Sequence, residues 1–128
     1  MNATEDVNWL DMPSVLYSTA ERLQAVEATG LNAGLDIHGH SHNPTTKQLA
    51  KALEPHGPLF TEEPILVDHP EALTQLANMT SIPIALDERL CHRWDAKIFL
   101  REGLIDMLQP VLCMQEGFQK PNVSRTRR

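Results

Sequence analysis

The sequence predicts an α/β fold in which about four parallel strands are covered by helices. Short apolar runs that end at turns alternate four times with amphipathic helical segments, which is the order of a parallel α/β sheet. Three carboxylates, Asp36, Glu62 and Glu88, each come at the end of such a run, and successive ones are 26 residues apart. One strand, one helix and two loops need roughly 25–35 residues, so this interval indicates a repeating βα unit.

Each expected element has its own local signals. Apolar residues at helical spacing predict the helices, and short apolar runs bounded by Gly or Pro predict the strands. In chain order, the expected helices begin near Pro13, Asn43, His69 and Trp94, and the expected strands cover residues 34–39, 59–63, 83–88 and 105–109. Asn43 is expected to cap the second helix, with Pro44 at its first helical position.

Length and composition indicate one domain. The chain has 128 residues, of which 41% are hydrophobic, and a formal net charge of −6. Lys and Arg are not gathered on any expected element, so a nucleic-acid partner is not expected. We interpret residues 1–12 as a lead-in and residues 13–110 as the domain. Residues 111–128 show neither the helical nor the strand period, which predicts an irregular, poorly ordered or divergent tail.

The sequence contains no signal for export or for membrane insertion. Its first six residues lack the basic and apolar blocks of a signal peptide, and no apolar run approaches the ~20 residues of a membrane span. Cys91 and Cys113 form no C-x-x-C pair, which fits a reducing compartment and gives no redox or zinc motif. We therefore expect a cytoplasmic protein without a membrane partner.

The evenly spaced carboxylates indicate a metal site. Parallel strands side by side would hold Asp36, Glu62 and Glu88 on one rim, about 5 Å from neighbour to neighbour. Such charges repel strongly unless a cation lies between them, and ligands that are all oxygen favour Mg²⁺. The alternative is three unrelated carboxylates that are solvated at loop mouths. Asp87 is expected to point away from the metal, because side chains alternate along a strand.

The histidines near the first strand admit three interpretations. His38 lies two residues after Asp36, so both side chains share one side if the extended conformation continues. An imidazole there would donate or accept a proton near neutral pH, whereas the plainer alternative is a solvated loop histidine. His38, His40 and His42 also form H-x-H-x-H, a spacing that could bind Zn²⁺ or Ni²⁺. The Gly and Ser between them favour a turn, and hence a surface cluster instead.

Three segments taken together resemble the barrel domain of the enolase superfamily. Within that superfamily they are most similar to the galactonate dehydratases of the mandelate racemase group. The segments are residues 34–39 (GLDIHG), 60–64 (FTEEP) and 83–89 (PIALDER). The resemblance covers about residues 13–110 and implies a partial (β/α) barrel of the TIM type, with Mg²⁺ at the carboxyl ends of the strands.

The resemblance also implies an enzyme, a lyase that removes water from a sugar acid. Asp36, Glu62 and Glu88 match the family's three Mg²⁺ ligands, and His38 matches the histidine that acts as general acid on the departing 3-hydroxyl. In that chemistry Mg²⁺ holds the substrate carboxylate and stabilises the enediolate formed when the α-proton is removed. The residues that contact the rest of the substrate are not assigned.

The chain departs from the family pattern in ways that bear on activity. Asp87 stands where the family has glycine, and Val111 stands where the family usually has an aspartate that orients a catalytic histidine. That histidine, the lid domain and the other strands of the eight-stranded barrel have no counterpart. We therefore expect a truncated form with impaired activity, whose open half-barrel edges favour self-association. The alternative is a non-catalytic metal-binding remnant or interaction fragment.

Overall fold

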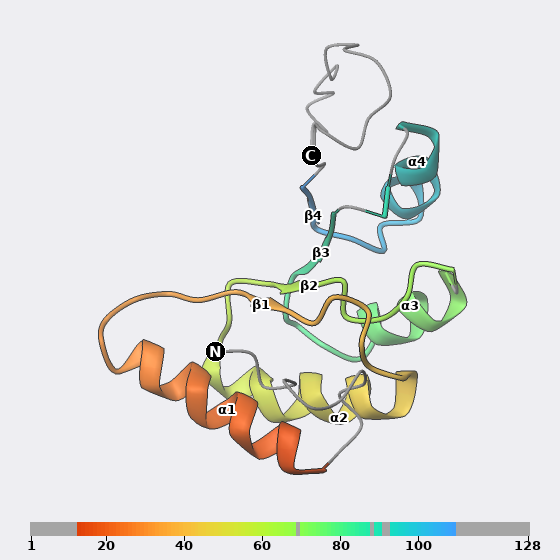
Figure 1. Ribbon diagram of the computed structural model, residues 1–128. Helices are drawn as coiled ribbons and strands as arrows, with labels where there is room; N and C mark the ends of the chain where they lie inside the picture. The colour runs from red at the N-terminus through yellow and green to blue at the C-terminus, as the bar shows by residue number, and fades with distance from the viewer. Residues whose placement is uncertain (1–12, 69, 88, 91–92, 110–128) are drawn as a thin grey trace.

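The computed structural model describes residues 13–68, 70–87, 89–90 and 93–109, and helices alternate with strands throughout them. The elements are α1 (Pro13–Glu27), β1 (Leu35–Asp36), α2 (Asn43–Leu53), the short 3-10 helix η1 (Glu54–His56), β2 (Thr61–Glu62), α3 (Pro70–Ala77), β3 (Ile84–Leu86), α4 (Arg93–Arg101) and β4 (Met107–Leu108). The strands are shorter than expected. The predicted α/β alternation is confirmed (Figure 1).

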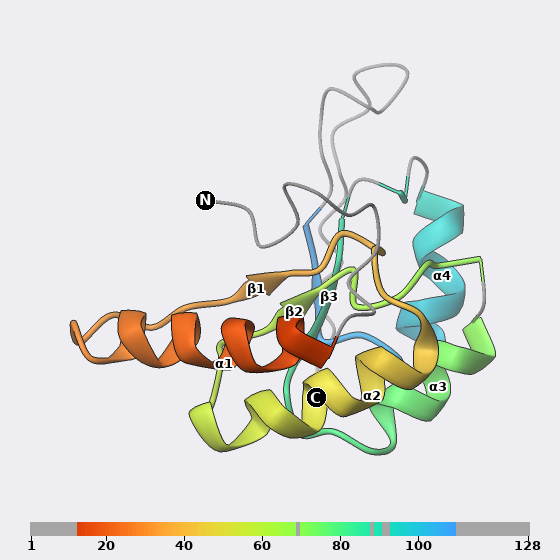
Figure 2. The same cartoon turned by 60° about the horizontal axis from the view of Figure 1, so that its bottom comes forward.

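The four strands form one parallel sheet in the order β1-β2-β3-β4. Consecutive strands are neighbours, so right-handed crossovers place the connecting helices on one face of the sheet. Figures 1 and 2 show α2, α3 and α4 along that face, with α1 packed beside α2. Because all strands run the same way, their carboxyl ends meet at one edge of the sheet, where the site residues were expected.

The strand register differs from the register that equal spacing suggests. Asp36 of β1 is the direct partner of Glu62 of β2, 26 residues later. The partner of Glu62 on β3, however, is Ala85, which is only 23 residues further along. The 26-residue interval therefore does not recur in the register of β2 with β3, and Leu86 and Asp87 lie beyond the level of Glu62.

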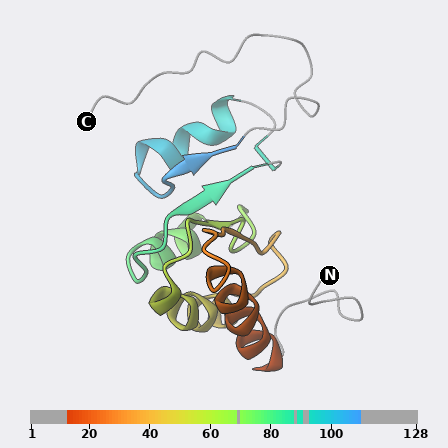
Figure 3. The ribbon, with the colours of Figure 1, turned by 90° about the vertical axis from the view of Figure 1, so that its left-hand side faces the viewer.

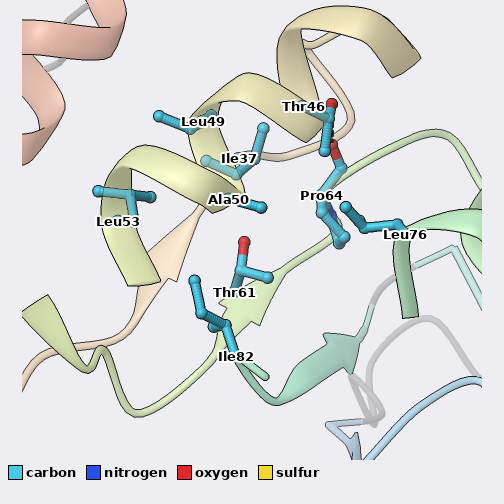
Figure 4. A pocket seen from close by; sticks show the side chains of 9 residues that line it. All are labelled: Ile37, Thr46, Leu49, Ala50, Leu53, Thr61, Pro64, Leu76 and Ile82. Atoms are coloured by element: carbon cyan, nitrogen blue, oxygen red, sulfur yellow. Dashed lines mark hydrogen bonds between the residues drawn. The ribbon is translucent and has the colours of Figure 1, made fainter. Parts of the chain in front are cut away.

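The space between the helices and the sheet is filled by apolar side chains in two clusters. One lies mainly under α3 and α4 and includes Leu76 and Leu86, both fully buried. The other, between α1, α2 and the sheet, includes Ile37, Leu49 and Ile82. Figure 4 shows side chains of α2 and of the sheet pointing toward one another there. The gap that remains measures about 10 Å³, so this region is packed core and no ligand site.

In the part of the chain that the structure describes, helices cover the sheet and the sheet does not close into a barrel. Figure 3 shows β3 and β4 beside α4, with α1 and α2 at the far end of the molecule. Among the described residues β1 and β4 are edge strands. In this part of the chain no helix is both long and apolar enough to cross a membrane.

The start of α2 differs from the expected one. Asn43 does not cap the helix: His42 is the cap residue, with φ −78° and ψ 153°, and makes no capping hydrogen bond through its side chain. The helix begins one residue earlier than expected because the His42 carbonyl already accepts a hydrogen bond from the Thr46 N–H (2.9 Å). The expected lead-in, the expected tail and His69 lie outside the described residues.

Replacing Leu76 by Ala should lower the free energy of unfolding by about 2–4 kcal/mol, because this side chain is fully buried between α3 and the sheet. Urea denaturation of the full chain measures the change. Leu100→Ala is the matched control, since Leu100 also lies on a helix but is 49% exposed and should cost less than about 1 kcal/mol. Equal losses in the two variants would contradict the assignment of the core.

Candidate active site

Two carboxylates are held side by side at the carboxyl edge of the sheet. Asp36 ends β1, Glu62 ends β2, and the register makes them direct neighbours. The hydrogen bond from the Ile37 N–H to the Glu62 carbonyl (3.0 Å) continues this pairing past the strands. The Asp36 side chain is 54% exposed, whereas Glu62 is partly buried and its Oε1 accepts no hydrogen bond among the described residues. Main-chain pairing thus keeps two like charges together.

The electrostatics of this edge show in the ionisation of Glu62. The pKa of Glu62 is raised from 4.5 to about 7. Burial is the largest cause, followed by repulsion from Asp36 and Asp87. Asp87 also contributes a hydrogen bond that requires a proton on one of the two carboxyls. A site that disfavours its own negative charge in this way is one in which a cation would be stabilised.

Asp87 lies toward Glu62, and the expectation that it points away was wrong. Glu62 is the register partner of Ala85, and side chains two residues apart point to the same side of a strand. Asp87 therefore follows the direction of Ala85 and Glu62. Its Oδ1 is buried and has no hydrogen-bond partner in the part of the chain that the structure describes. The sequence predicted the opposite direction because it counted the alternation of side chains from Glu88 and could not specify the register of β3 with β2.

His38 reaches Asp36 by a turn and not by continued extension of β1. The backbone of His38 has φ +55° and that of Gly39 has φ +65°, and the His40 N–H donates to the Ile37 carbonyl (3.1 Å). Two central residues with positive φ define a type I′ turn. His38 Nδ1 then lies 3.7 Å from Asp36 Oδ2, and the His38 side chain is 46% exposed. The imidazole is therefore accessible beside the carboxylate pair.

The H-x-H-x-H segment does not form a metal cluster. The rings of His38 and His40 meet edge to face, with centroids 5.4 Å apart, and His42 is the cap residue of α2. Among the described residues, which include all three histidines, no three His, Cys, Asp or Glu side chains are grouped closely enough to hold a metal ion. The Zn²⁺ or Ni²⁺ alternative is therefore not supported.

The described donors fit Mg²⁺ in kind but supply only part of a coordination shell. Asp36, Glu62 and Asp87 offer oxygen ligands alone, and buried oxygens of Glu62 and Asp87 lack hydrogen-bond partners. Glu88 lies outside the described residues. Asp36 and Glu62 are thus the two expected ligands that the structure brings together.

The structure also pairs Glu63 and Arg89, two residues for which the sequence pattern predicts no direct role at the site. The Glu63 side chain is 1% exposed, and its Oε2 accepts a hydrogen bond from Arg89 Nε at 3.1 Å. Both residues directly follow expected ligands in the sequence, which is the one signal that could have found them. Their pairing joins the turn after β2 to the turn after β3.

Comparison with known proteins agrees with this fold. Residues 12–120 match the family model described as "Enolase C-terminal domain-like", and the chain belongs to this family. A curated relative, the D-galactonate dehydratase of Variovorax paradoxus (strain S110), is 39% identical over 120 residues. That alignment covers 91% of this chain but 31% of the relative, so the chain spans about a third of the relative's length.

Solved structures give the same result. A member of the enolase superfamily from Salmonella Typhimurium superposes with a TM-score of 0.76 at 27% identity, over 83% of this chain and 28% of the other. A mandelate racemase/muconate lactonizing enzyme-like protein from Roseovarius sp. TM1035 superposes with a TM-score of 0.75 at 30% identity, over 80% and 26%. These neighbours confirm the partial barrel predicted from the sequence.

Glu62→Gln should remove a pH dependence of stability in the metal-free chain. The folded state keeps the Glu62 proton up to about pH 7 and the unfolded chain releases it near 4.5, so folding binds a proton between these values. The free energy of unfolding should therefore fall by ~1–2 kcal/mol as pH rises through this window, with solvent screening allowed for. Urea titrations at several pH values measure it. Glu21→Gln on α1, an exposed site, should keep the parent slope; an unchanged slope in Glu62→Gln would contradict the assignment.

Proposed function

We propose that this chain carries part of the active site of a Mg²⁺-dependent dehydratase, a lyase that removes water from a sugar acid. The observation that carries the proposal is the placement of Asp36, Glu62 and His38 at one edge of the sheet, with His38 3.7 Å from Asp36. The relative that is 39% identical and named D-galactonate dehydratase supports the substrate class.

Asp36, Glu62 and Glu88 are proposed as the metal ligands. The assignment of Asp36 and Glu62 is supported by the strand register and by the raised pKa of Glu62, and the assignment of Glu88 is based on its position in the sequence. When bound, Mg²⁺ supplies positive charge for the substrate carboxylate and for the negative charge that develops during reaction. Ionised Glu62 would then be favoured at neutral pH, because the cation offsets the repulsion from its neighbours.

His38 is proposed as the proton donor to the departing hydroxyl group. Its exposed imidazole faces the solvent side of the carboxylate edge, where a substrate would enter. Asp36 Oδ2 lies 3.7 Å from His38 Nδ1 and holds the ring toward the site. No described residue is assigned to removal of the α-proton. A positioned base contributes about 10²–10⁴-fold, so we propose impaired turnover by this chain.

A second candidate is a metal-binding protein of the same family without catalytic activity. It rests on Asp36 and Glu62 alone, the register partners that would bind a cation without any proton transfer by His38. The two candidates differ in turnover and agree in metal binding, so they need separate measurements.

Calorimetric titration of the full chain with Mg²⁺ tests the ligands. Glu62→Gln and Glu88→Gln should each weaken binding by at least about tenfold, because each removes a charged oxygen ligand. Glu21→Gln carries the same change of charge on the exposed face of α1 and should bind as the parent does. Unchanged affinity in both ligand variants would remove the metal assignment.

Assay of water elimination from galactonate and related sugar acids tests the catalytic role. His38→Asn should abolish measurable turnover yet leave Mg²⁺ affinity within about threefold, since Asn tolerates the left-handed backbone that position 38 requires. His56→Asn, at a histidine of η1 paired with Glu27 away from the carboxylate edge, is the control. No turnover by the parent chain, with Mg²⁺ binding intact, would favour the non-catalytic candidate.

A further inference from the structure

The turns that follow three successive strands meet at Glu63. This residue comes directly after β2, and its side chain is almost completely buried. A buried carboxylate is costly unless it is paired and hydrogen-bonded. Arg89, in the turn after β3, supplies that pair through Nε at 3.1 Å from Oε2, and its own side chain is 35% exposed. The ion pair with Arg89 therefore offsets the cost of burying the Glu63 carboxylate and keeps this side chain buried.

The main chain of Glu63 is held in an unusual conformation. Its φ is +40°, a conformation that is unfavourable for a non-glycine residue and persists only where the surroundings enforce it. The Glu63 N–H donates to the Ala85 carbonyl (3.0 Å), and the Glu63 carbonyl accepts from the Gly39 N–H (2.8 Å). Through this one residue, β3 is connected to the turn that carries His38.

Arg89 also covers that turn directly. A Cβ atom added at Gly39 would lie 3.4 Å from Arg89 Nη2, 3.6 Å from Nε and 2.8 Å from Leu66 Cδ2. The guanidinium is therefore packed against the backbone of Gly39, on the side where any other residue would carry a side chain. Position 39 requires glycine for two reasons: the backbone has a positive φ of +65°, and the Arg89 and Leu66 side chains lie where a Cβ atom would be.

We propose that the Arg89–Glu63 ion pair is the positioning element for His38. The ion pair keeps the hydrogen bond from the Gly39 N–H to the Glu63 carbonyl in place and covers the exposed side of the turn. These two contacts hold His38, whose backbone is left-handed, beside Asp36. Arg89 is thus a positioning residue, which acts on His38 through Gly39. Only the use of His38 as a proton donor rests on the proposed function; the fixing of the turn does not.

Amide hydrogen exchange of the metal-free full chain, followed by NMR, tests the proposal. Arg89→Ala should lower the protection of the Gly39 amide by about tenfold or more, because opening of the turn becomes easier. The Leu59 amide, which bonds to the Ala33 carbonyl at 2.8 Å at the other end of β2, should keep its protection. Arg101→Ala removes an exposed arginine of α4 and should change neither amide. Arg89→Lys should recover part of the Gly39 protection, since Lys keeps the charge but lacks the planar guanidinium.

Two outcomes would overturn the proposal. One is unchanged Gly39 protection in Arg89→Ala. The other is a loss of the same factor at Gly39 and Leu59, which would mean that Arg89 supports the whole fold and not this turn. The test needs neither metal nor substrate, so a failure of Mg²⁺ binding would count against the proposed function alone.

A pair of glycine variants tests the packing of Arg89 independently of its charge. Gly39→Ala and Gly57→Ala both place a side chain on a backbone with positive φ, at +65° and +59°. Only Gly39 has neighbours within 4 Å of the added atom, so Gly39→Ala should displace the Arg89 Nε–H resonance and Gly57→Ala should not. An unmoved Arg89 resonance in Gly39→Ala would contradict the close packing on which the proposal depends.

Discussion

The site depends on one constraint, the parallel register that makes Asp36 and Glu62 direct neighbours. Main-chain hydrogen bonds fix the ends of β1 and β2, so the two carboxylates cannot separate without breaking the pairing of the strands. Their repulsion, together with burial, appears in the raised pKa of Glu62. A cation or a proton relieves this repulsion, and which one is bound at neutral pH decides the charge of the site.

A second feature is the left-handed backbone at His38 and Glu63, both at the carboxyl edge of the sheet. Neither residue is glycine, so each conformation costs free energy that neighbouring contacts must offset. The bond from Gly39 to the Glu63 carbonyl and the ion pair of Glu63 with Arg89 are those contacts. The two strained residues thus support each other across neighbouring strands, which fits a site that needs side chains in fixed positions.

The differences from the sequence predictions have physical causes. Asp87 was expected to point away because side chains alternate along a strand and Glu88 was taken to face the metal, but the register partner of Glu62 is Ala85, two residues before Asp87. Asn43 was expected to cap α2, but the helix includes one residue more. For the histidine triplet the sequence favoured a turn over a metal cluster, and the positive φ of His38 and Gly39 agrees with that preference. The first error concerns the register of β3, and the second concerns the residue at which α2 begins.

The sequence alone determined the alternation of strands and helices, the parallel order and the location of Asp36 and Glu62 at strand ends, because periodicity and Gly or Pro boundaries are local properties. It also carried the resemblance to the enolase superfamily, which the family match confirms. Only the tertiary structure decided the register, the direction of Asp87 and the contact of Arg89 with Glu63 and Gly39. These depend on how separate strands slide past one another and on the packing between their turns, which no local pattern of residues specifies.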